Sequence, residues 1–299
     1  MRYRFIHEME GQFCVTALCR AMQVTRSGYY AWRGREPCQR RKENEALLGR
    51  IGHFFERSGQ TYGSPRIWRD LQEAGFTCGK HRVARLMRAE GFRAVAAPRF
   101  RGTTDSKHAH PVAQNLLDRN FGTPETNVKW AGDVTYLWTG EGWLYLAVVL
   151  DLFSRRVVGW CMQANFDRSL VVNALQAAVC QRRPEAGLLH HSDQGSQYAS
   201  GDFQALLCQQ RIVCSMSRKG NCWDNAPVES FFGTLKQELV HRRRFATREA
   251  ARREVFEYIE VWYNRQRRHS SLDYLSPAEF ERRALTGTTK AGTLSSACA

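Results

Sequence analysis

The sequence predicts a mixed α/β fold, in which a five-stranded sheet with flanking helices follows a helical N-terminal region. Residues 128–162 hold three short runs rich in β-branched and aromatic residues, separated by turn-forming residues. Residues 167–241 then alternate between helix-like and strand-like apolar patterns. Residues 1–95 instead carry apolar residues at helical spacing among many Arg and Lys side chains. The sheet therefore belongs to the second half of the chain.

The first helical unit is assigned to residues 1–58. Within it, residues 13–33 are expected to form two short helices joined by a turn, and either Thr25 or Ser27 caps the second one. A charged connecting helix follows. This is helix-turn-helix spacing, and Arg26 lies on the second helix, so we expect Arg26 to contact DNA.

The second helical unit is assigned to residues 59–95. Ser64 is expected to cap a helix that has Pro65 in its first position. A strongly basic helix follows, with Arg82 and Arg85 on its outer face. Such a charged face is usually only solvated. Two helical pairs in tandem on a chain of net charge +15 nevertheless favour contact with DNA.

Three further segments complete the expected organisation. Residues 96–127 mix basic residues with Pro, Gly, Thr and Ser, which is typical of a basic linker. Residues 128–284 form the main domain with its C-terminal helices, including a helix capped by Ser276. Residues 285–299 are small and polar, and we expect them to be disordered.

The order of elements in the main domain is three strands, helix, strand, helix, strand, helix. Turn residues at 140–142 and 151–154 make the first three strands an antiparallel meander. Asp167 and Ser200 are expected to cap the two helices that separate the later strands. This order is that of a ribonuclease-H-like domain, a mixed sheet covered by helices.

The composition narrows the class of partner. The chain has 44 Lys and Arg against 29 Asp and Glu, and this surplus favours a polyanion. Its ten cysteines include no C-x-x-C pair, so no zinc ribbon or dithiol site is readable. The N-terminus has no apolar leader, and the apolar run at 143–150 is too short to span a bilayer. We expect a protein of the reducing cytoplasm without membrane contact.

Three acidic residues stand in distinctive local sequences. Asp133 is expected in the middle of the first strand, Asp193 just after the fourth, and Glu229 in the first turn of the last helix of this order. These positions can direct three carboxylates to one point. Converging carboxylates raise one another's pKa, and divalent metal ions supply the compensating charge. On so basic a chain, we predict that the three acids bind metal ions and catalyse displacement at a nucleic-acid phosphate.

Each of these acids also has an ordinary structural explanation, as a paired strand acid, a turn residue or a helix-capping acid. The three contexts together favour catalysis. His190 and His191 either orient Asp193 or fill strand positions, and we favour the structural role. Asn225 and Lys236 fall on the same side of the helix as Glu229, so we expect both to contact DNA.

Three long motifs carry a resemblance to a known family. They are Trp-Ala-Gly-Asp-Val-Thr-Tyr at 130–136, His-Ser-Asp-Gln-Gly-Ser-Gln-Tyr at 191–198, and the segment 217–236 that contains Asp-Asn-Ala-Pro-Val-Glu-Ser-Phe-Phe-Gly-Thr-Leu-Lys. They resemble the second-frame product of bacterial insertion sequences of the insertion-sequence-three type, and shorter segments extend the likeness over nearly the whole chain. The resemblance implies a transposase with a catalytic core similar to that of retroviral integrases.

The resemblance implies particular site residues, an activity and a cofactor. Asp133, Asp193 and Glu229 become the metal-binding triad, with Lys236 as the basic residue two turns beyond Glu229. The activity becomes metal-dependent cleavage at the 3′ ends of an insertion sequence, followed by strand transfer. Two Mg²⁺ ions suit the all-oxygen ligands, and Mn²⁺ is expected to substitute for them.

The partners implied are double-stranded DNA, both the element ends and the target, further copies of this chain on the DNA, and the protein of the upstream frame. Family members carry an upstream segment joined by frameshifting, so we expect this chain to be part of the active enzyme. Two rival functions are a plain nuclease of the same fold and a DNA-binding regulator of transposition that is inactive without the upstream-frame product. The long basic N-terminal region argues against the nuclease, and the intact triad argues against the regulator.

Overall fold

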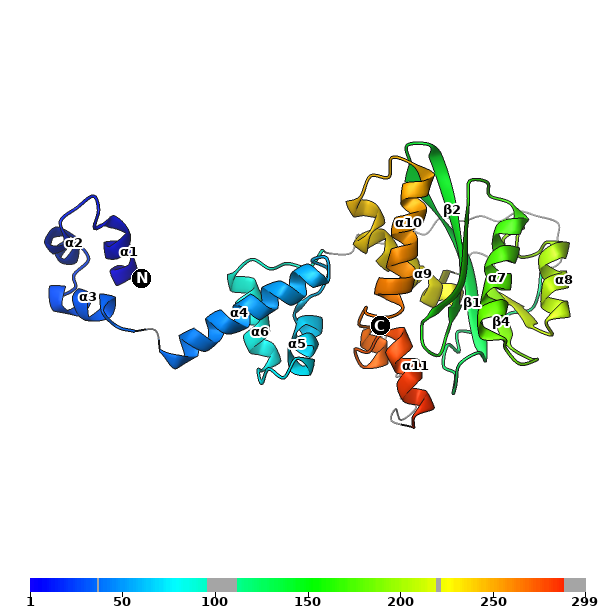
Figure 1. The fold of residues 1–299 in the computed structure, drawn as a ribbon, viewed down its shortest axis with the longest axis horizontal. Helices are drawn as coiled ribbons and strands as arrows, with labels where there is room; N and C mark the ends of the chain where they lie inside the picture. The colour runs from blue at the N-terminus through cyan, green and yellow to red at the C-terminus, as the bar shows by residue number, and fades with distance from the viewer. Residues whose placement is uncertain (37, 96–111, 219–221, 288–299) are drawn as a thin grey trace.

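The computed structural model describes residues 1–36, 38–95, 112–218 and 222–287. Figure 1 shows three parts in chain order, namely a small group of helices at the N-terminus, a second group of helices, and a larger α/β domain. In the described ranges, no helix is both long enough and apolar enough to cross a membrane.

The N-terminal group consists of three short helices around one small apolar cluster. Ile6, Leu18, Cys19 and Tyr29 form the buried centre. Thr25 caps the third helix, because its hydroxyl accepts a hydrogen bond from the Gly28 amide at 3.1 Å. The first helix was not predicted, since Ile6 is its only buried residue and it therefore shows no apolar periodicity. The bounds are α1 Arg2–Met9, α2 Val15–Ala21 and α3 Arg26–Arg33.

The second group packs three helices around a single larger cluster. The bounds are α4 Gln39–Arg57, α5 Ser64–Glu73 and α6 Lys80–Ala89. Helix α4, which the sequence grouped with the preceding helices, thus packs with the helices that follow it. Ser64 does not cap α5, because Gly63 occupies the cap position and no side chain makes a capping hydrogen bond. Pro65 is tolerated one position further in, since the first-turn amides have no intrahelical acceptor.

The α/β domain is built on a five-stranded sheet with strand order β3-β2-β1-β4-β5. The first three strands form the predicted antiparallel meander, while β4 runs parallel to β1 and β5 runs parallel to β4. The bounds are β1 Lys129–Thr139, β2 Gly142–Asp151, β3 Val157–Gln163, β4 Leu189–Ser192 and β5 Val213–Met216. This arrangement confirms the ribonuclease-H-like mixed sheet.

Helices cover both faces of the sheet, and each face has its own apolar cluster (Figure 1). Helices α7 and α8 pack on one face, and α9 and α10 pack on the other. Their bounds are α7 Arg168–Arg182, α8 Gly201–Gln209, α9 Ala226–Glu238 and α10 Arg248–Glu257, and α11 Pro277–Leu285 follows. Asp167 and Ser276 cap α7 and α11 as predicted. Ser200 occupies the cap position of α8, but its hydroxyl donates to the Gln197 carbonyl instead.

The predicted linker and tail lie partly outside the described residues, at 96–111 and 288–299. The described end of the linker packs on the domain. The amides of Leu116 and Leu117 donate to the Ser215 hydroxyl at 2.9 and 3.2 Å. The segment from residue 112 therefore belongs to the surface of the α/β domain.

The second helical group is fastened to the C-terminal part of the α/β domain. The Arg268 guanidinium donates to Asp70 and to Glu73, each at 2.8 Å. The Arg268 amide donates to the Tyr62 hydroxyl at 2.7 Å. Trp262 packs against the apolar clusters of both parts. These contacts place a helical, basic unit at a defined position on the domain that carries the acidic residues.

Candidate active site

Asp133 lies in the fifth position of β1, the central strand of the sheet. It pairs with Val148 across the antiparallel ladder to β2, so its backbone is held within the sheet. On the other side, Trp130 and Ala131 pair with His190 and His191 of β4 in a parallel register. A rigid central strand therefore fixes the first carboxylate.

Asp193 follows β4 directly, as predicted. Extending the parallel register by two residues brings Asp193 level with Asp133 on the neighbouring strand. The Asp193 carboxylate accepts a hydrogen bond from the Gly195 amide at 2.9 Å. A Cβ at Gly195 would lie only 2.9 Å from that oxygen, so a side chain at this position would displace the Asp193 carboxylate. The tight turn thus orients the second carboxylate.

Glu229 lies in the first turn of α9. Val228, Phe231, Phe232 and Leu235 form the buried stripe of this helix, at the predicted helical spacing. Glu229 borders this stripe and is only partly exposed. The packing of α9 on the sheet therefore presents the third carboxylate to the first.

Asn225 joins the start of α9 to the strand that carries Asp133. Its side-chain amide donates to the Gly132 carbonyl at 3.1 Å, and the residue is only 5% exposed. Its Oδ1 atom has no hydrogen-bond partner among the described residues. This burial favours a positioning role for Asn225 over the DNA contact predicted from its side of the helix.

Asp224 is a buried anchor for the segment before α9. Its carboxylate accepts hydrogen bonds from the side chains of Arg218, Arg119 and Asn115, at distances of 2.7 to 3.0 Å. These donors hold the pKa of Asp224 well below its usual range. Sequence spacing could not reveal this role, because Asn115 and Arg119 lie far away in the chain.

The charges of the three acids act on one another. Burial raises the pKa of Asp133 well above its usual range, and the negative charges of Asp193 and Glu229 raise it further. The Val134 amide, 2.7 Å from the Asp133 carboxylate, and the charge of Lys236 oppose this rise. Burial also raises the pKa of Glu229. The three acids from three elements thus form one electrostatic site that is short of positive charge.

The two histidines beside Asp193 have structural positions, which agrees with the role favoured from the sequence. His191 lies at 2.8 Å from the Ser215 hydroxyl, and burial lowers its pKa to about 4. Burial lowers the pKa of His190 to about 3. A Cβ at Gly132 would lie 2.9 Å from the His190 ring, so the neutral ring fills the space that glycine leaves beside Asp133.

The oxygen-rich donor set fits a hard divalent cation. Carboxylates are the ligands that Mg²⁺ prefers, and the raised pKa of Asp133 shows that a nearby cation would be stabilising. In the described part of the chain, however, no group of three His, Cys, Asp or Glu side chains is arranged to hold one metal ion. The acids therefore share an electrostatic environment without forming a closed coordination sphere.

Lys236 lies two turns after Glu229 on α9. Burial lowers its pKa, and the charge of Asp133 opposes this. The ammonium lies 5.3 Å from the centre of the Tyr136 ring. Lys236 thus stands between the acids and an aromatic surface, where it can meet a phosphate group.

The arginines predicted to contact DNA differ in their surroundings. Arg26 on α3 and Arg85 on α6 are exposed. Arg82 on α6 instead donates to Asn44 at 2.8 Å and to Glu43 at 3.2 Å, both on α4. Arg82 therefore helps to hold α6 against α4, while Arg26 and Arg85 present their charges to the solvent.

Models of known families match three segments of the chain. Integrase core domain models match residues 123–222 and 229–285. An HTH-like domain model matches residues 42–100. The first two matches contain all three acids, and the third begins inside α4, in agreement with the packing of that helix.

Curated relatives match almost the whole chain. The transposase InsF for insertion sequence IS3A of Escherichia coli (strain K12) is 44% identical over 292 residues, covering 95% of this chain and 100% of the relative. An uncharacterized 31 kDa protein of insertion element IS600 from Shigella sonnei is 44% identical over 263 residues, covering 88% of this chain and 97% of the relative.

Solved structures give weaker likenesses. A chain of the simian T-cell lymphotropic virus intasome, in complex with a PP2A regulatory subunit, gives a TM-score of 0.45 at 14% identity. It covers 77% of this chain and 74% of its own. The HTLV-2 integrase catalytic core domain in complex with magnesium gives a TM-score of 0.41 at 18% identity. It covers 52% of this chain and 97% of its own.

Proposed function

Because the chain belongs to the family of IS3 insertion-sequence transposases, we propose that Asp133, Asp193 and Glu229 are its catalytic centre. The protein is a transposase that acts on DNA, with an HTH-like domain and an integrase core. One observation carries the assignment of the centre: the parallel register of β1 and β4 brings Asp193 level with Asp133, and the Asn225 side chain ties the start of α9, which carries Glu229, to Gly132 beside Asp133.

The proposed centre binds two divalent ions, Mg²⁺ by preference and Mn²⁺ as a substitute. Such ions, when bound, supply the charge that activates a water or a 3′-hydroxyl and stabilises the leaving 3′ oxygen. The chain's own residues would hold the ions and orient the DNA strand. The three carboxylates provide the ligands, Asn225 keeps α9 in register with β1, and Lys236 binds a phosphate beside the site. No side-chain nucleophile is required.

The assignment is tested with a labelled duplex of the element's end in Mg²⁺, comparing the wild type with Asp193→Asn. We expect nicking at the 3′ end and joining by the wild-type sequence, in the frame-fused protein if the chain alone only binds DNA. The variant should lose about 100-fold or more of this activity in the same form of the protein, since even partners outside the metal ligands cost up to this much. Asp202→Asn is the matched control, because Asp202 is an exposed acid on α8, paired with Arg168. Cleavage by Asp193→Asn at the wild-type rate would reject the assignment.

Two partners belong to the same proposal. We propose that copies of the chain assemble on DNA, because two element ends and a target must be held together during strand transfer. We also propose that the upstream-frame protein completes the enzyme, because the likeness to second-frame products implies an upstream segment that is joined by frameshifting. DNA binding without cleavage in Mg²⁺ or Mn²⁺, with cleavage restored by the frame-fused protein, is the expected outcome if the second proposal holds. Continued inactivity of the fused protein would favour the regulator.

DNA contact by the second helical group has its own matched test. Arg85 is exposed on α6, whereas Arg82 is tied to Glu43 and Asn44. We expect Arg85→Ala to reduce the slope of log affinity against log salt by about 1, as for one lost phosphate contact. Arg82→Ala should leave that slope nearly unchanged and instead lower stability. Equal slopes for Arg85→Ala and the wild type would remove Arg85 from the interface.

A further inference from the structure

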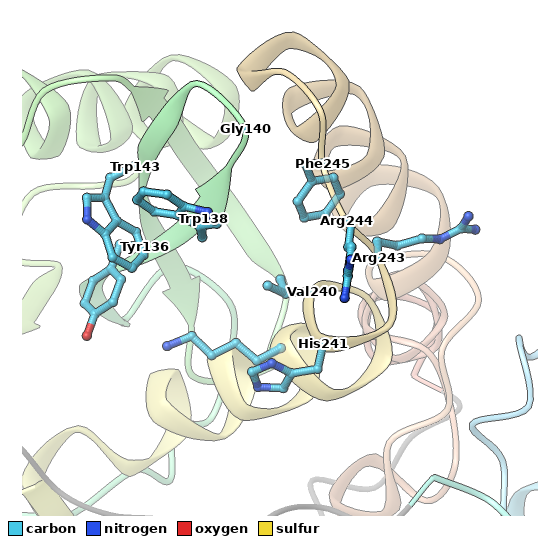
Figure 2. Close-up of a pocket in the computed structure, with 10 residues that line it drawn as sticks. Tyr136, Trp138, Gly140, Trp143, Val240, His241, Arg243, Arg244 and Phe245 are labelled. Carbon is cyan, nitrogen blue, oxygen red and sulfur yellow. The ribbon is translucent and has the colours of Figure 1, made fainter.

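A groove with a volume of about 630 Å³ lies on the α/β domain and includes Lys236 in its lining. Its walls are the hairpin of β1 and β2 and the segment 240–245 that follows α9. Figure 2 shows the rings of Tyr136, Trp138 and Trp143 gathered on one wall, with Phe245 and Arg244 on the other. The groove is open to solvent along the aromatic wall, because the side chains of Tyr136, Trp138 and Trp143 are exposed.

The aromatic wall is ordered by strand pairing. Trp138 and Trp143 pair directly across the β1–β2 ladder, and Tyr136 lies two residues before Trp138 on the same face of β1. The Trp138 and Trp143 rings meet edge to face at 4.8 Å between centroids, and the Tyr136 and Trp143 rings do so at 5.0 Å. The rings therefore brace one another in fixed orientations.

Cross-strand aromatic pairs commonly stabilise hairpins, so their pairing alone has a structural explanation. Exposure decides against that explanation here. Trp138 is 60% exposed, Tyr136 55% and Trp143 43%, although each ring could bury far more area. Phe245 on the facing wall is only 5% exposed and belongs to the apolar cluster of the domain, whereas the three rings do not. The three exposed rings remain as a surface for a flat partner.

The charge of the groove points to a nucleic acid. Lys236, His241, Arg243 and Arg244 contribute to its lining, and none of the described lining residues is acidic. Arg243 is paired with Glu254 and points away from the groove in Figure 2. Arg244 is exposed and lines the wall opposite the aromatic rings. A positive groove with rigid aromatic faces has the chemistry of a single-strand site, where bases stack on rings and cations hold the backbone.

Among the described residues that line the groove, Lys236 is the one that also interacts with the proposed catalytic centre. Lys236 lines the groove, lies 5.3 Å above the Tyr136 ring, and senses the charge of Asp133. A strand whose phosphate meets Lys236 can therefore pass from the acids to the aromatic wall. The hairpin end is stabilised from outside the sheet, because the Gly140 amide donates to the Phe245 carbonyl at 2.9 Å. The groove is thus held in shape before any ligand binds.

We propose that this groove binds unpaired nucleotides of a DNA strand next to the cleavage position, with bases stacked on Trp138, Trp143 and Tyr136 and phosphates held by Lys236 and Arg244. The proposal rests on the transposase function and adds a single-strand subsite to it. It implies that an element end opens next to the scissile phosphate when it enters the site.

The test measures binding of the full chain to a short fluorescein-labelled oligothymidylate by anisotropy, in EDTA. We expect Trp138→Ala and Trp143→Ala each to weaken this binding about tenfold, the scale of one lost base stack. Trp138→Phe, which keeps an aromatic face, should recover most of the affinity. Phe256→Ala is the matched control, because Phe256 is an equally exposed aromatic residue on α10 and does not line the groove.

A blunt duplex is the second probe, and it separates the subsite from general DNA binding. The alanine variants should change blunt-duplex affinity less than twofold. The proposal is overturned by absent oligothymidylate binding in the wild type, by equal losses on both probes, or by an effect of Phe256→Ala as large as that of Trp138→Ala. A change of oligomeric state without loss of oligothymidylate binding would overturn it too, assigning the groove to a second copy of the chain.

These outcomes are independent of the catalytic assignment, because the binding is measured without metal. Asp193→Asn should bind oligothymidylate as the wild type does, even though it does not cleave. If the catalytic assignment fails, Asp193→Asn cleaves and the groove variants still lose single-strand affinity. If the subsite fails, the groove variants bind oligothymidylate normally and Asp193→Asn remains inactive.

Discussion

At the scale of single residues, Asp133 serves the proposed catalytic site but lowers the stability of the fold. Its carboxyl group lies in the central strand, next to two further acids, and both burial and their charges raise its pKa. The unfolded chain would ionise this group near its ordinary pKa of about 3.9. Ionisation therefore favours the unfolded state as the pH rises above that value. A fold keeps such a residue only where its charge is needed for another purpose.

Replacing Asp133 by Asn should raise stability and remove activity together. In EDTA at neutral pH, the variant should unfold at a higher temperature than the wild type, because no charge must be desolvated. The difference should shrink as the pH falls and should vanish below about 4, where the wild-type carboxyl becomes protonated in the unfolded state as well. Cleavage should fall by about 100-fold or more. Thermal unfolding followed by circular dichroism over this pH range makes the measurement.

The exposed acid Asp202 again provides the control for Asp133→Asn. Asp202→Asn keeps the site intact, so neither the gain in unfolding temperature nor the loss of cleavage should appear. An unfolding temperature of Asp133→Asn that is equal to or below that of the wild type at neutral pH would contradict the electrostatic account of the site.

At the scale of elements, two glycines near the acids have opposite surroundings. Gly132 precedes Asp133 in β1, and a Cβ there would lie 2.9 Å from the His190 ring. Gly233 lies in the interior of α9, four residues after Glu229 and three before Lys236, and a Cβ there would meet nothing within 4 Å. Glycine inside a helix is unfavourable by about 1 kcal/mol relative to alanine. The free space at Gly233 therefore suggests a ligand that approaches the helix closely.

The two alanine substitutions should separate packing from DNA approach. Gly132→Ala should destabilise the fold by about 1 to 3 kcal/mol, because the buried His190 ring must move. Gly233→Ala should stabilise it by about 0.5 to 1 kcal/mol while weakening duplex binding, since the new methyl group stands between Glu229 and Lys236. Chemical denaturation and titration with duplex DNA measure both effects. Unchanged DNA affinity in Gly233→Ala would show that DNA keeps its distance from this face.

Sequence patterns predicted the elements of the α/β domain well, because their signals are local. Turn residues separate the first three strands, and Asp167 and Ser276 mark helix starts with a side-chain hydrogen bond. The three acids were found for the same reason, since each stands in a long distinctive segment.

Long-range contacts explain what the sequence patterns did not give. The Asp224 anchor depends on Asn115, more than a hundred residues earlier. The burial of Asn225 follows from its bond to Gly132, and the pairing of Arg82 follows from the packing of α6 on α4. Helix α1 was not predicted, because a single buried side chain gives no helical periodicity of apolar residues. The aromatic groove required the strand register and the 240–245 segment, which no single pattern contains.

At the scale of the whole molecule, Arg268 links the second helical group to the α/β domain. Its guanidinium lies between Asp70, which is 3% exposed, and Glu73. Burial raises the pKa of Asp70, and the charge of Arg268 opposes that rise. Both acids belong to α5, while Arg268 follows α10 and its π-helical extension Tyr258–Tyr263. Together with Trp262 and the Arg69–Asp273 ion pair, this side chain couples the orientation of a DNA-binding unit to the catalytic domain.

Removing this link should weaken DNA binding without touching a DNA contact. Arg268→Ala leaves the buried Asp70 with only the half-exposed Arg57 as a cationic partner among the described residues, at a cost of about 3 to 5 kcal/mol. The two parts should then be held less tightly, by the Trp262 contacts and the Arg69–Asp273 ion pair that remain, with a larger radius of gyration in X-ray scattering. Duplex affinity should fall because two linked sites lose their fixed spacing and thus part of their effective concentration.

Arg267→Ala is the neighbouring control that separates lost coupling from lost stability. Arg267 makes an equally buried ion pair, but its partner Glu238 belongs to α9 in the same domain. Its loss should therefore cost comparable stability with no change in the radius of gyration of the folded protein. Arg268→Lys should fall between the wild type and Arg268→Ala, because a single ammonium cannot bridge both acids as the guanidinium does. If Arg267→Ala and Arg268→Ala expand the molecule equally, the expansion reflects general destabilisation, and the two parts are not coupled through Arg268.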